Sequence, residues 1–269
     1  MGWKMYVTKA SGEKEKFDVE KVRSTCLRGG ASKQLADKIA EEIEAKAYDG
    51  ITTKEILHLT LKLLKEEPEA AIRYDLKRAI MALGPTGFPF EEFMAEVLKN
   101  HGYETKVGEI VNGKCVSHEI DITAEKEDMR YLVECKYHNA PGIRTGLEVV
   151  MYTYARFLDL SKKFHQAWLI CNTKCTAEAK RYGRCVGVKV TSWRYPGRES
   201  LEKMVETKRL YPITILRSVT EPIRERLFQA RVMLARNLLE HEIEDLERTT
   251  GLSQRVLDEI REEARKIIQ

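Results

Sequence analysis

The sequence predicts an α/β protein of several domains: a mostly helical N-terminal part that opens on a β-hairpin, a central mixed sheet flanked by helices, and a helical C-terminal region. Two observations predict this class. Helical and strand-like periods alternate in the middle of the chain, whereas helical periods dominate both ends. The run Gly-Pro-Thr-Gly at 84–87 is the clearest break. The predicted domains are residues 1–86, 87–195 and 196–269.

The N-terminal part is predicted to begin with a hairpin and to continue as four helices. Strand-like runs at 6–9 and 14–17 flank the turn pair Ser11-Gly12. Ser32 has the character of an N-cap, and the run from Thr52 to Glu55 is a capping box before an apolar stripe. The expected helices begin at Asp18, after Ser32, after Thr52 and at Pro68, and they end near Leu27, Tyr48, Leu64 and Leu83.

The central part is predicted to form a mixed sheet with helices on both faces. Its order is helix, three strands, helix, strand, helix and strand, which is typical of such a sheet. The run 167–171 is wholly apolar, as expected for a buried strand. The expected helices cover 89–101, 144–162 and 176–184, and the expected strands cover 103–108, 115–124, 130–137, 167–171 and 186–192.

The C-terminal region is predicted to be helical. A long helix is expected over 219–241. A shorter pair follows, with helices at 244–250 and from there to Ile268, joined by Gly251-Leu252-Ser253. The segment 239–268 is similar to a helix-hairpin-helix, which presents backbone N–H groups to DNA phosphates. A plain packing or oligomerisation pair is the alternative interpretation.

Two acids and a lysine lie in two strand-like runs that we expect to be neighbours. Alternate residues of a strand face the same way, so Glu134 and Lys136 project together, with Cα atoms roughly 7 Å apart. If the preceding run lies alongside, Asp121 joins Glu134 as a second oxygen ligand. Two carboxylates with water suit Mg²⁺ or Mn²⁺. Because Lys136 would then orient or polarise a water against a phosphodiester, the pattern predicts nuclease chemistry.

The alternative interpretation of this pattern is a solvated surface. Charged residues make up 33% of the chain, and the Glu-x-Lys spacing therefore recurs elsewhere, on expected helix faces or turns. Context separates the pair at 134 and 136 from those repeats, because it lies in a strand-like run, follows an apolar run with an aspartate, and precedes a helix. The repeats begin at Glu44, Glu104, Glu178 and Glu206.

Composition sets broad limits on partners and compartment. The formal net charge is +4 and the isoelectric point about 8.6, a mild basic bias that permits a polyanion partner. The start of the chain has no apolar signal core, and no apolar run reaches 18 residues, so we expect a soluble, cytoplasmic protein without a membrane partner. The six cysteines lack zinc-finger spacing and are expected to be free, buried, small hydrophobes.

The N-terminal part resembles the ATP-cone, a small allosteric nucleotide-binding module, over nearly its whole length. The resemblance implies that ATP or dATP binds between the hairpin and the helices, with Lys9 and Lys21 on the phosphates and Val7, Val22 and Thr53 near the base and sugar. The chain has no GxxxxGK[ST] loop, so binding without hydrolysis is expected. A small helical domain with solvated lysines is the alternative. The matching residues are Val7-Thr8-Lys9, Ser11-Gly12, Glu15, Phe17-Asp18, Lys21-Val22, 48–53, Arg73-Tyr74 and Arg78.

The central part resembles the Mrr-like branch of the PD-(D/E)xK nucleases. The resemblance implies a restriction-endonuclease-like domain in which Asp121 and Glu134 hold the metal and Lys136 assists the nucleophile. It also implies an additional active-site glutamate that completes the metal shell; Glu91 is preferred for it, and its neighbour Glu92 is the alternative. The matching motifs are Phe90-Glu91-Glu92-Phe93, Asn100-His101-Gly102-Tyr103-Glu104, Glu119-Ile120-Asp121-Ile122 and Val133-Glu134-Cys135-Lys136.

Together these observations predict a metal-dependent DNA endonuclease of the restriction-endonuclease-like superfamily, with Mg²⁺ or Mn²⁺ as cofactor and ATP or dATP as allosteric ligand. His138, Arg144 and Thr145 follow the Glu-x-Lys strand and are expected to meet the DNA backbone, with plain surface as the alternative. A homodimer is expected, because cutting two strands needs two active sites. One alternative is a non-catalytic, nucleotide-responsive DNA-binding protein on a nuclease scaffold. A transcriptional regulator ranks lower, since no paired CxxC precedes the hairpin.

Overall fold

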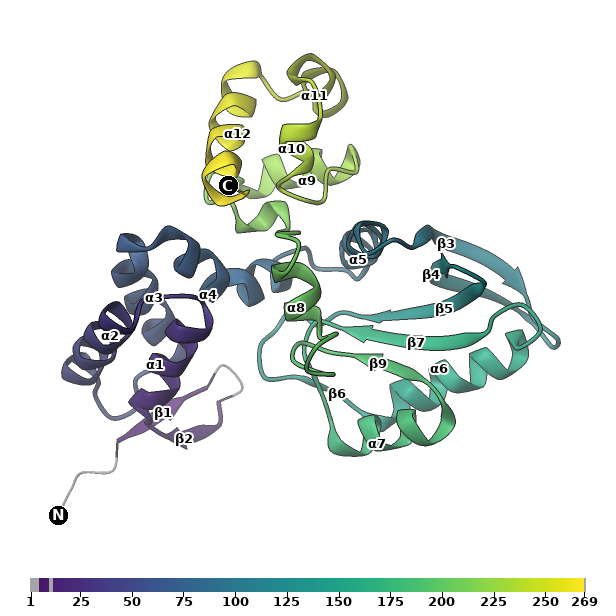
Figure 1. The fold of residues 1–269 in the computed structure, drawn as a ribbon, viewed down its shortest axis with the longest axis horizontal. Helices are drawn as coiled ribbons and strands as arrows, with labels where there is room; N and C mark the ends of the chain where they lie inside the picture. Colours follow the sequence, from purple (N-terminus) through teal and green to yellow (C-terminus); the bar gives the residue numbers. More distant parts are fainter. Residues whose placement is uncertain (1–4, 10–11, 269) are drawn as a thin grey trace. The chain divides into compact units, whose positions relative to one another are not determined.

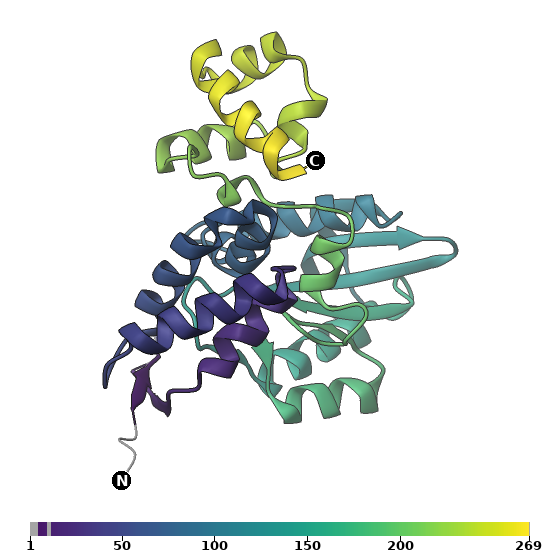
Figure 2. The ribbon, with the colours of Figure 1, turned by 60° about the vertical axis from the view of Figure 1, so that its left-hand side comes forward.

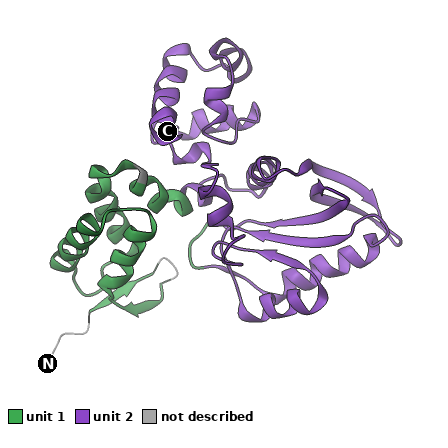
Figure 3. Cartoon of the chain, in the orientation of Figure 1, with its two compact units in different colours: residues 1–78, 140–142 green, residues 79–139, 143–269 purple. Residues whose placement is uncertain are grey.

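The computed structural model describes all residues except 1–4, 10–11 and 269, and the chain divides into two compact units (Figure 3). The mixed α/β class expected from the sequence is confirmed. Across the part of the chain that is described, no helix combines the length and apolar character that a membrane crossing requires. The first unit comprises residues 1–78 with 140–142, and the second comprises 79–139 with 143–269.

The first unit is a hairpin followed by four helices, as the sequence predicts (Figures 1 and 2). Its elements are β1 (Tyr6–Thr8), β2 (Lys14–Lys16), α1 (Val19–Arg28), α2 (Lys33–Lys46), α3 (Thr53–Leu63), the 3₁₀ helix η1 (Leu64–Glu66) and most of α4 (Pro68–Met81), whose last three residues belong to the second unit. The Ser32 hydroxyl accepts the N–H of Leu35, and Thr52 and Glu55 form the reciprocal capping box. Part of the predicted turn, Ser11, lies outside the described residues.

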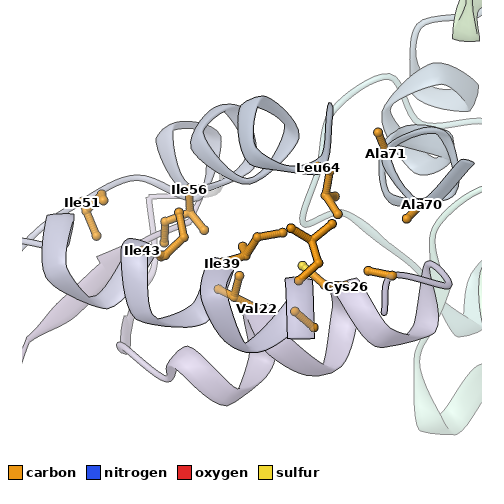
Figure 4. Close-up of a cluster of buried hydrophobic side chains, with 12 residues drawn as sticks. Val22, Cys26, Ile39, Ile43, Ile51, Ile56, Leu64, Ala70 and Ala71 are labelled. Carbon is orange, nitrogen blue, oxygen red and sulfur yellow. The ribbon is translucent and has the colours of Figure 1, made fainter. Parts of the chain in front are cut away.

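The core of the first unit lies between α1, α2 and the chain that follows them (Figure 4). Ile39 and Ile43 are one helical turn apart on α2, and they are buried together with Val22 and Cys26 of α1. Burying an isoleucine side chain fully stabilises a fold by about 1.5–3 kcal/mol. Val7 of the hairpin packs against the same cluster. This core therefore holds the hairpin and α1 in place.

The second unit contains a five-stranded mixed sheet, in the order β3-β4-β5-β7-β9, which confirms the prediction. Its main elements are α5 (Phe88–Asn100), β3 (Glu104–Asn112), β4 (Ser117–Lys126), β5 (Met129–Lys136), α6 (Leu147–Leu160), β7 (Gln166–Cys171), α7 (Ala177–Val186), β9 (Lys189–Thr191) and α8 (Leu201–Glu206). β3, β4 and β5 are antiparallel neighbours, whereas β5, β7 and β9 run parallel. Figures 1 and 2 show α5 on one face of the sheet and α6 and α7 on the other.

The turn between β3 and β4 is tied to α6 through Asp159. The Asp159 carboxylate accepts the N–H of Cys115 at 2.7 Å and that of Val116 at 3.3 Å, and it pairs with His118 Nε2 at 2.8 Å. These donors, His118 first, hold the pKa of Asp159 well below its usual range. Gly113 is required here, because a Cβ atom at this position would overlap the carboxylate. The turn is therefore fixed to the helix.

One helix begins later than the sequence predicts. A helix was expected over 144–162, but α6 starts at Leu147 and the preceding residues form the short strand β6 (Arg144–Thr145). β6 pairs in parallel with β8 (Lys174–Cys175). Gly146 has an extended backbone and caps α6. A β-branched threonine followed by glycine favours strand and chain reversal over a first helical turn.

The long helix predicted over 219–241 is wrong. The structure has two helices there, α9 (Glu221–Gln229) and α10 (Asn237–Glu240), separated by a non-helical stretch. Arg231 has a positive φ of 58°, which ends the helical path. The four consecutive apolar residues 232–235 are all buried. A helix would turn part of that run away from the core, whereas the observed chain buries all of it.

The last helix pair agrees with the prediction. α11 (Ile243–Thr250) and α12 (Gln254–Ile268) are joined at Gly251, whose φ of 63° lies in the left-handed region that favours glycine. Glu263 of α12 accepts the backbone N–H of Arg217 at 2.7 Å, just after the 3₁₀ helix η2 (Ile213–Ile215). This bond ties α12 to the chain that follows the sheet.

The six cysteines are all free, as expected. Four of them are buried, but Cys115 and Cys185 are exposed, because the first lies in the β3–β4 turn and the second on α7. The sulfur atoms of Cys171 and Cys175 are 3.3 Å apart in the apolar layer between the sheet and α6. The prediction that the cysteines act as small core residues thus holds for four of the six.

Candidate functional sites

Asp121 and Glu134 lie side by side where β4 and β5 separate. The antiparallel ladder pairs Ile122 with Val133, so the next position in register sets Asp121 beside Glu134. At that position the Asp121 side chain takes over as acceptor, and its Oδ2 receives the N–H of Cys135 at 2.7 Å. This bond fixes one carboxylate oxygen, and the group keeps acceptor capacity for a further partner.

Glu134 is largely buried and carries an ion pair. Its side chain is 14% exposed, and its Oε2 accepts a hydrogen bond from Arg156 Nη1 at 2.6 Å. Burial first, and then the charge of Asp121, raise the pKa of Glu134 to about 7, against the opposite effects of Arg156 and Lys136. Desolvation and the neighbouring acid therefore outweigh both cations.

Glu91, in the first turn of α5, lies in the same electrostatic field. Burial first, and then the charges of Asp121, Glu119 and Glu134, raise the pKa of Glu91 to about 7. Burial also raises the pKa of Asp121 above its ordinary value. We refer to Glu91, Asp121 and Glu134 as the carboxylate cluster. Its members repel one another, so the cluster is suited to bind a cation.

Lys136 ends β5 beside the carboxylate cluster, and its side chain is exposed. Its charge lowers the pKa of Asp121 and of Glu134. The donor set, carboxylate oxygens beside one ammonium, has the chemistry that hard ions such as Mg²⁺ and Mn²⁺ prefer. Among the described side chains, no three acids, histidines or cysteines are close enough to hold an ion by themselves. The residues therefore fit an ion that keeps several of its waters.

Arg156 of α6 is a member of this site that the sequence analysis does not find. Besides Glu134, its Nη1 reaches the carbonyl oxygen of Glu119 at 3.2 Å, and the guanidinium lies 4.5 Å from the centre of the Tyr152 ring. A signal for it exists in the sequence. Arg156 follows Thr153 by three positions and precedes Leu160 by four, and both are buried, so a charge lies on the buried stripe of the helix.

The three residues predicted to contact DNA lie together but differ in exposure. His138 Nε2 and Thr145 Oγ1 are 3.1 Å apart. Thr145 is 1% exposed, whereas Arg144 is exposed. The backbone N–H of His138 donates to Asn172 Oδ1 at 2.9 Å, which fixes the chain after β5. Burial, and then the charge of Lys136, lower the pKa of His138. Of the three, Arg144 has the side chain best placed to meet a polyanion.

All five residues predicted to bind a nucleotide line one hollow of the first unit. This nucleotide hollow has a volume of about 240 Å³. Its wall also includes Tyr74, whose pKa burial raises to about 12, so that the phenol stays protonated. The five residues are Val7 and Lys9 at the hairpin, Lys21 and Val22 on α1, and Thr53 at the start of α3.

Glu15 of β2 stands between the two lysines of the nucleotide hollow. Lys9 Nζ is 2.5 Å from one Glu15 oxygen, and Lys21 Nζ hydrogen-bonds to the other. Lys9 also pairs with Glu13 at 3.2 Å. A carboxylate that bridges two ammonium groups has the position and charge of a phosphate oxygen pair. Glu15 therefore neutralises both lysines of the nucleotide hollow.

A second hollow of about 240 Å³ lies in the second unit and is mainly basic. Two aromatic rings form part of its wall, and each has an ammonium group over it. Lys189 Nζ lies 3.9 Å from the centre of the Trp168 ring, and Lys126 Nζ lies 5.0 Å from that of Tyr103. The sequence does not reveal this basic hollow, because its charges come from separate elements. They are Lys126, Lys189, Arg198 and Lys203, with Glu199 as the single acid.

Comparison with protein families identifies three segments of the chain. Residues 5–80 match the ATP cone domain. Residues 84–194 match a restriction endonuclease domain. Residues 211–268 match the C-terminal domain of AF1548-like proteins. The first two segments contain the nucleotide hollow and the carboxylate cluster, respectively.

Individual proteins are also similar to this chain in sequence or in structure. An uncharacterised protein of Archaeoglobus fulgidus is 47% identical over 176 residues, which cover 65% of this chain and 99% of that protein. A second uncharacterised protein of the same organism is 50% identical over 38 residues, or 14% of this chain and 81% of that protein. Among solved structures, that of AF1548, a protein of unknown function, matches with a TM-score of 0.62 and 44% identity, over 68% of this chain and 98% of that one.

Proposed function

Because the chain belongs to the family of AF1548-like proteins and joins an ATP cone to a restriction-endonuclease-type domain, we propose that it is a metal-dependent DNA endonuclease regulated by ATP or dATP. The observation that carries the proposal is that Asp121, Glu134 and Lys136 come together where β4 and β5 separate, with Glu91 in the same field. The proposed domains are residues 1–86 for nucleotide binding, residues 87–195 for the nuclease and residues 196–269 for the helical C-terminal part.

The chemistry follows from what these side chains can hold and orient. Asp121 and Glu134 would bind one or two Mg²⁺ or Mn²⁺ ions, and Glu91, rather than its neighbour Glu92, would complete or orient the shell. A divalent ion held by these residues would supply charge stabilisation at the phosphate and would lower the pKa of a water bound to it. Lys136 would orient the attacking water, whose oxygen bonds to phosphorus as the bond to the leaving sugar oxygen breaks, while the water gives up a proton to solvent and the leaving oxygen takes one from solvent. The Cys135 N–H keeps the Asp121 carboxylate in place.

DNA is the proposed partner because basic groups gather on the same unit. The basic hollow offers four Lys or Arg side chains against one Glu, and Arg144 is exposed near the end of β5. Such groups bind phosphates and make the affinity fall as salt rises. A homodimer would supply the second active site that a double-strand cut needs.

The test of the nuclease is cleavage of plasmid and branched DNA by the purified protein in Mg²⁺ or Mn²⁺. Asp121→Ala and Lys136→Ala are each expected to abolish nicking while the melting temperature stays near that of the wild type. Lys106→Ala is the matched control, since Lys106 is an exposed lysine on β3, and it should cleave normally. Full activity in purified Asp121→Ala would end the assignment.

The test of the regulation is calorimetric binding of ATP and dATP to the full chain, combined with cleavage and size measurements. Binding without hydrolysis is expected, and Lys21→Ala should weaken it because Lys21 lines the nucleotide hollow. Occupancy is expected to change either the rate of cleavage or the oligomer size. Identical cleavage and identical size with and without nucleotide would remove the regulatory role.

A second candidate function is a nucleotide-responsive DNA-binding protein that does not cleave. The pairing of Glu134 with Arg156 favours it, because this contact occupies a carboxylate that the metal would need. DNA binding without cleavage of any DNA form, in Mg²⁺ and in Mn²⁺, would support this second function over the first.

A further inference from the structure

Arg156 is held beside the carboxylate cluster by several contacts. Its Nη1 donates to Glu134 Oε2 at 2.6 Å and to the carbonyl of Glu119 at 3.2 Å, and its Nη2 donates to the hydroxyl of Tyr152. The guanidinium lies over the Tyr152 ring, and the side chain is only 12% exposed. A fixed positive charge is thus built into the site from α6.

The cluster needs such a charge. Three carboxyl groups, Glu91, Asp121 and Glu134, act on one another there. A buried negative charge is stabilised by an opposite charge held in contact with it, and Arg156 makes that contact with Glu134. Arginine keeps its charge at every working pH. Arg156 therefore stays the partner of Glu134 as long as no other cation takes that place.

We propose that Arg156 is the internal counter-ion of the carboxylate cluster, and that it competes with the divalent ion for Glu134. The inference rests on the nuclease function proposed above. Metal binding at Glu134 Oε2 then requires this oxygen to release Arg156. The guanidinium keeps its contacts with the Glu119 carbonyl and with the hydroxyl and ring of Tyr152 after release, so it stays beside the cluster.

The released guanidinium has the chemistry to bind a phosphodiester. Its planar fork fits two phosphate oxygens, which an ammonium group does not match. DNA that engages Arg156 would thereby free Glu134 for the metal, and metal that takes Glu134 would free Arg156 for DNA. By linkage each ligand then strengthens the binding of the other. Without DNA the metal affinity is held low.

The test is calorimetric binding of Mn²⁺ to the full chain, without DNA, at pH 8.5. Arg156→Gln is expected to lower the Kd for Mn²⁺ about tenfold, because a unit charge a few ångströms from the ion is removed. Arg156→Lys, which keeps the charge, should stay close to the wild type. Arg181→Gln, an exposed position on α7, is the control and should change nothing. If Arg156 only held Glu134 in position, Arg156→Gln would instead raise the Kd for Mn²⁺, because a loosened Glu134 would bind the ion more weakly.

The outcomes separate this inference from the function on which it rests. If the wild type binds Mn²⁺ and Arg156→Gln binds it no more tightly, the counter-ion role is overturned and the metal site stands. If neither protein binds Mn²⁺, the role and the proposed nuclease both fall. Arg156→Met keeps most of the side-chain volume and is the second variant, with the same expected tightening if the glutamine variant does not fold. Thermal unfolding checks each variant.

Discussion

Replacing Glu91 by glutamine is predicted to stabilise the metal-free protein at pH 8. The pKa of this carboxyl is raised from 4.5 to about 7, first by burial and then by Asp121, Glu119 and Glu134. One pKa unit corresponds to about 1.4 kcal/mol, so the shift sets an upper limit of about 3 kcal/mol. Because the group is only half-buried, solvent screening reduces this to about 1–2 kcal/mol.

The gain depends on pH in a defined direction. In the unfolded chain the carboxyl ionises near its ordinary pKa, whereas in the folded protein it ionises near 7. The stability that neutral Glu91 contributes is therefore fully present below the unfolded pKa and is lost as the pH rises through about 7. The advantage of Glu91→Gln over the wild type is accordingly largest at pH 8 and vanishes as the pH falls toward the unfolded value.

The assay is thermal unfolding in EDTA at pH 5 and at pH 8. For a unit of this size, one kcal/mol shifts the melting temperature by about 2–4 °C, so a rise of about 2–8 °C is expected at pH 8 and little change at pH 5. Glu104→Gln, at an exposed position of β3, is the matched control. If Glu91→Gln were no more stable than the wild type at pH 8, the raised pKa of Glu91, with burial and the neighbouring acids as its causes, would be refuted.

Two further predictions concern the first unit. Glu15→Gln is expected to tighten ATP binding, because a neutral amide no longer neutralises Lys9 and Lys21; calorimetry measures it, and weaker binding would show instead that Glu15 positions the lysines. Ile39→Ala is expected to destabilise the unit by about 2–5 kcal/mol, since the side chain is fully buried. Urea unfolding of the full chain, followed through the loss of ATP binding, checks this; an unchanged midpoint would contradict the packing.

Much of the regular structure follows from short-range chemistry that is visible in the sequence. The Ser32 cap and the capping box of Thr52 and Glu55 occur as predicted, because each depends on residues within one turn of the helix. The proximity of Asp121 and Glu134 needs one further assumption, that successive strand-like runs pair, and the sheet meets it. The catalytic roles assigned to these residues stay predictions.

Contacts between distant segments could not be predicted in the same way. Arg156 reaches Glu134 from a helix that starts after an intervening loop, and only its place on a buried stripe hints at a partner. The bridging position of Glu15 depends on the hairpin and α1 meeting in space. The long helix predicted over 219–241 fails for a related reason. Burial of the whole run 232–235 overrides local helical periodicity.

A single helix, α6, contacts both the β3–β4 turn and the carboxylate cluster. Asp159 accepts a hydrogen bond from the β3–β4 turn, and Arg156, three residues earlier, donates one to Glu134. Three residues of helix span only about 4.5 Å, so Asp159 and Arg156 are coupled over a short distance within α6. Displacing Asp159, for example with a side chain at Gly113, is expected to shift Glu134, which is proposed to hold the metal, and so to alter the Mn²⁺ affinity. The β3–β4 turn is therefore coupled to the carboxylate cluster through α6.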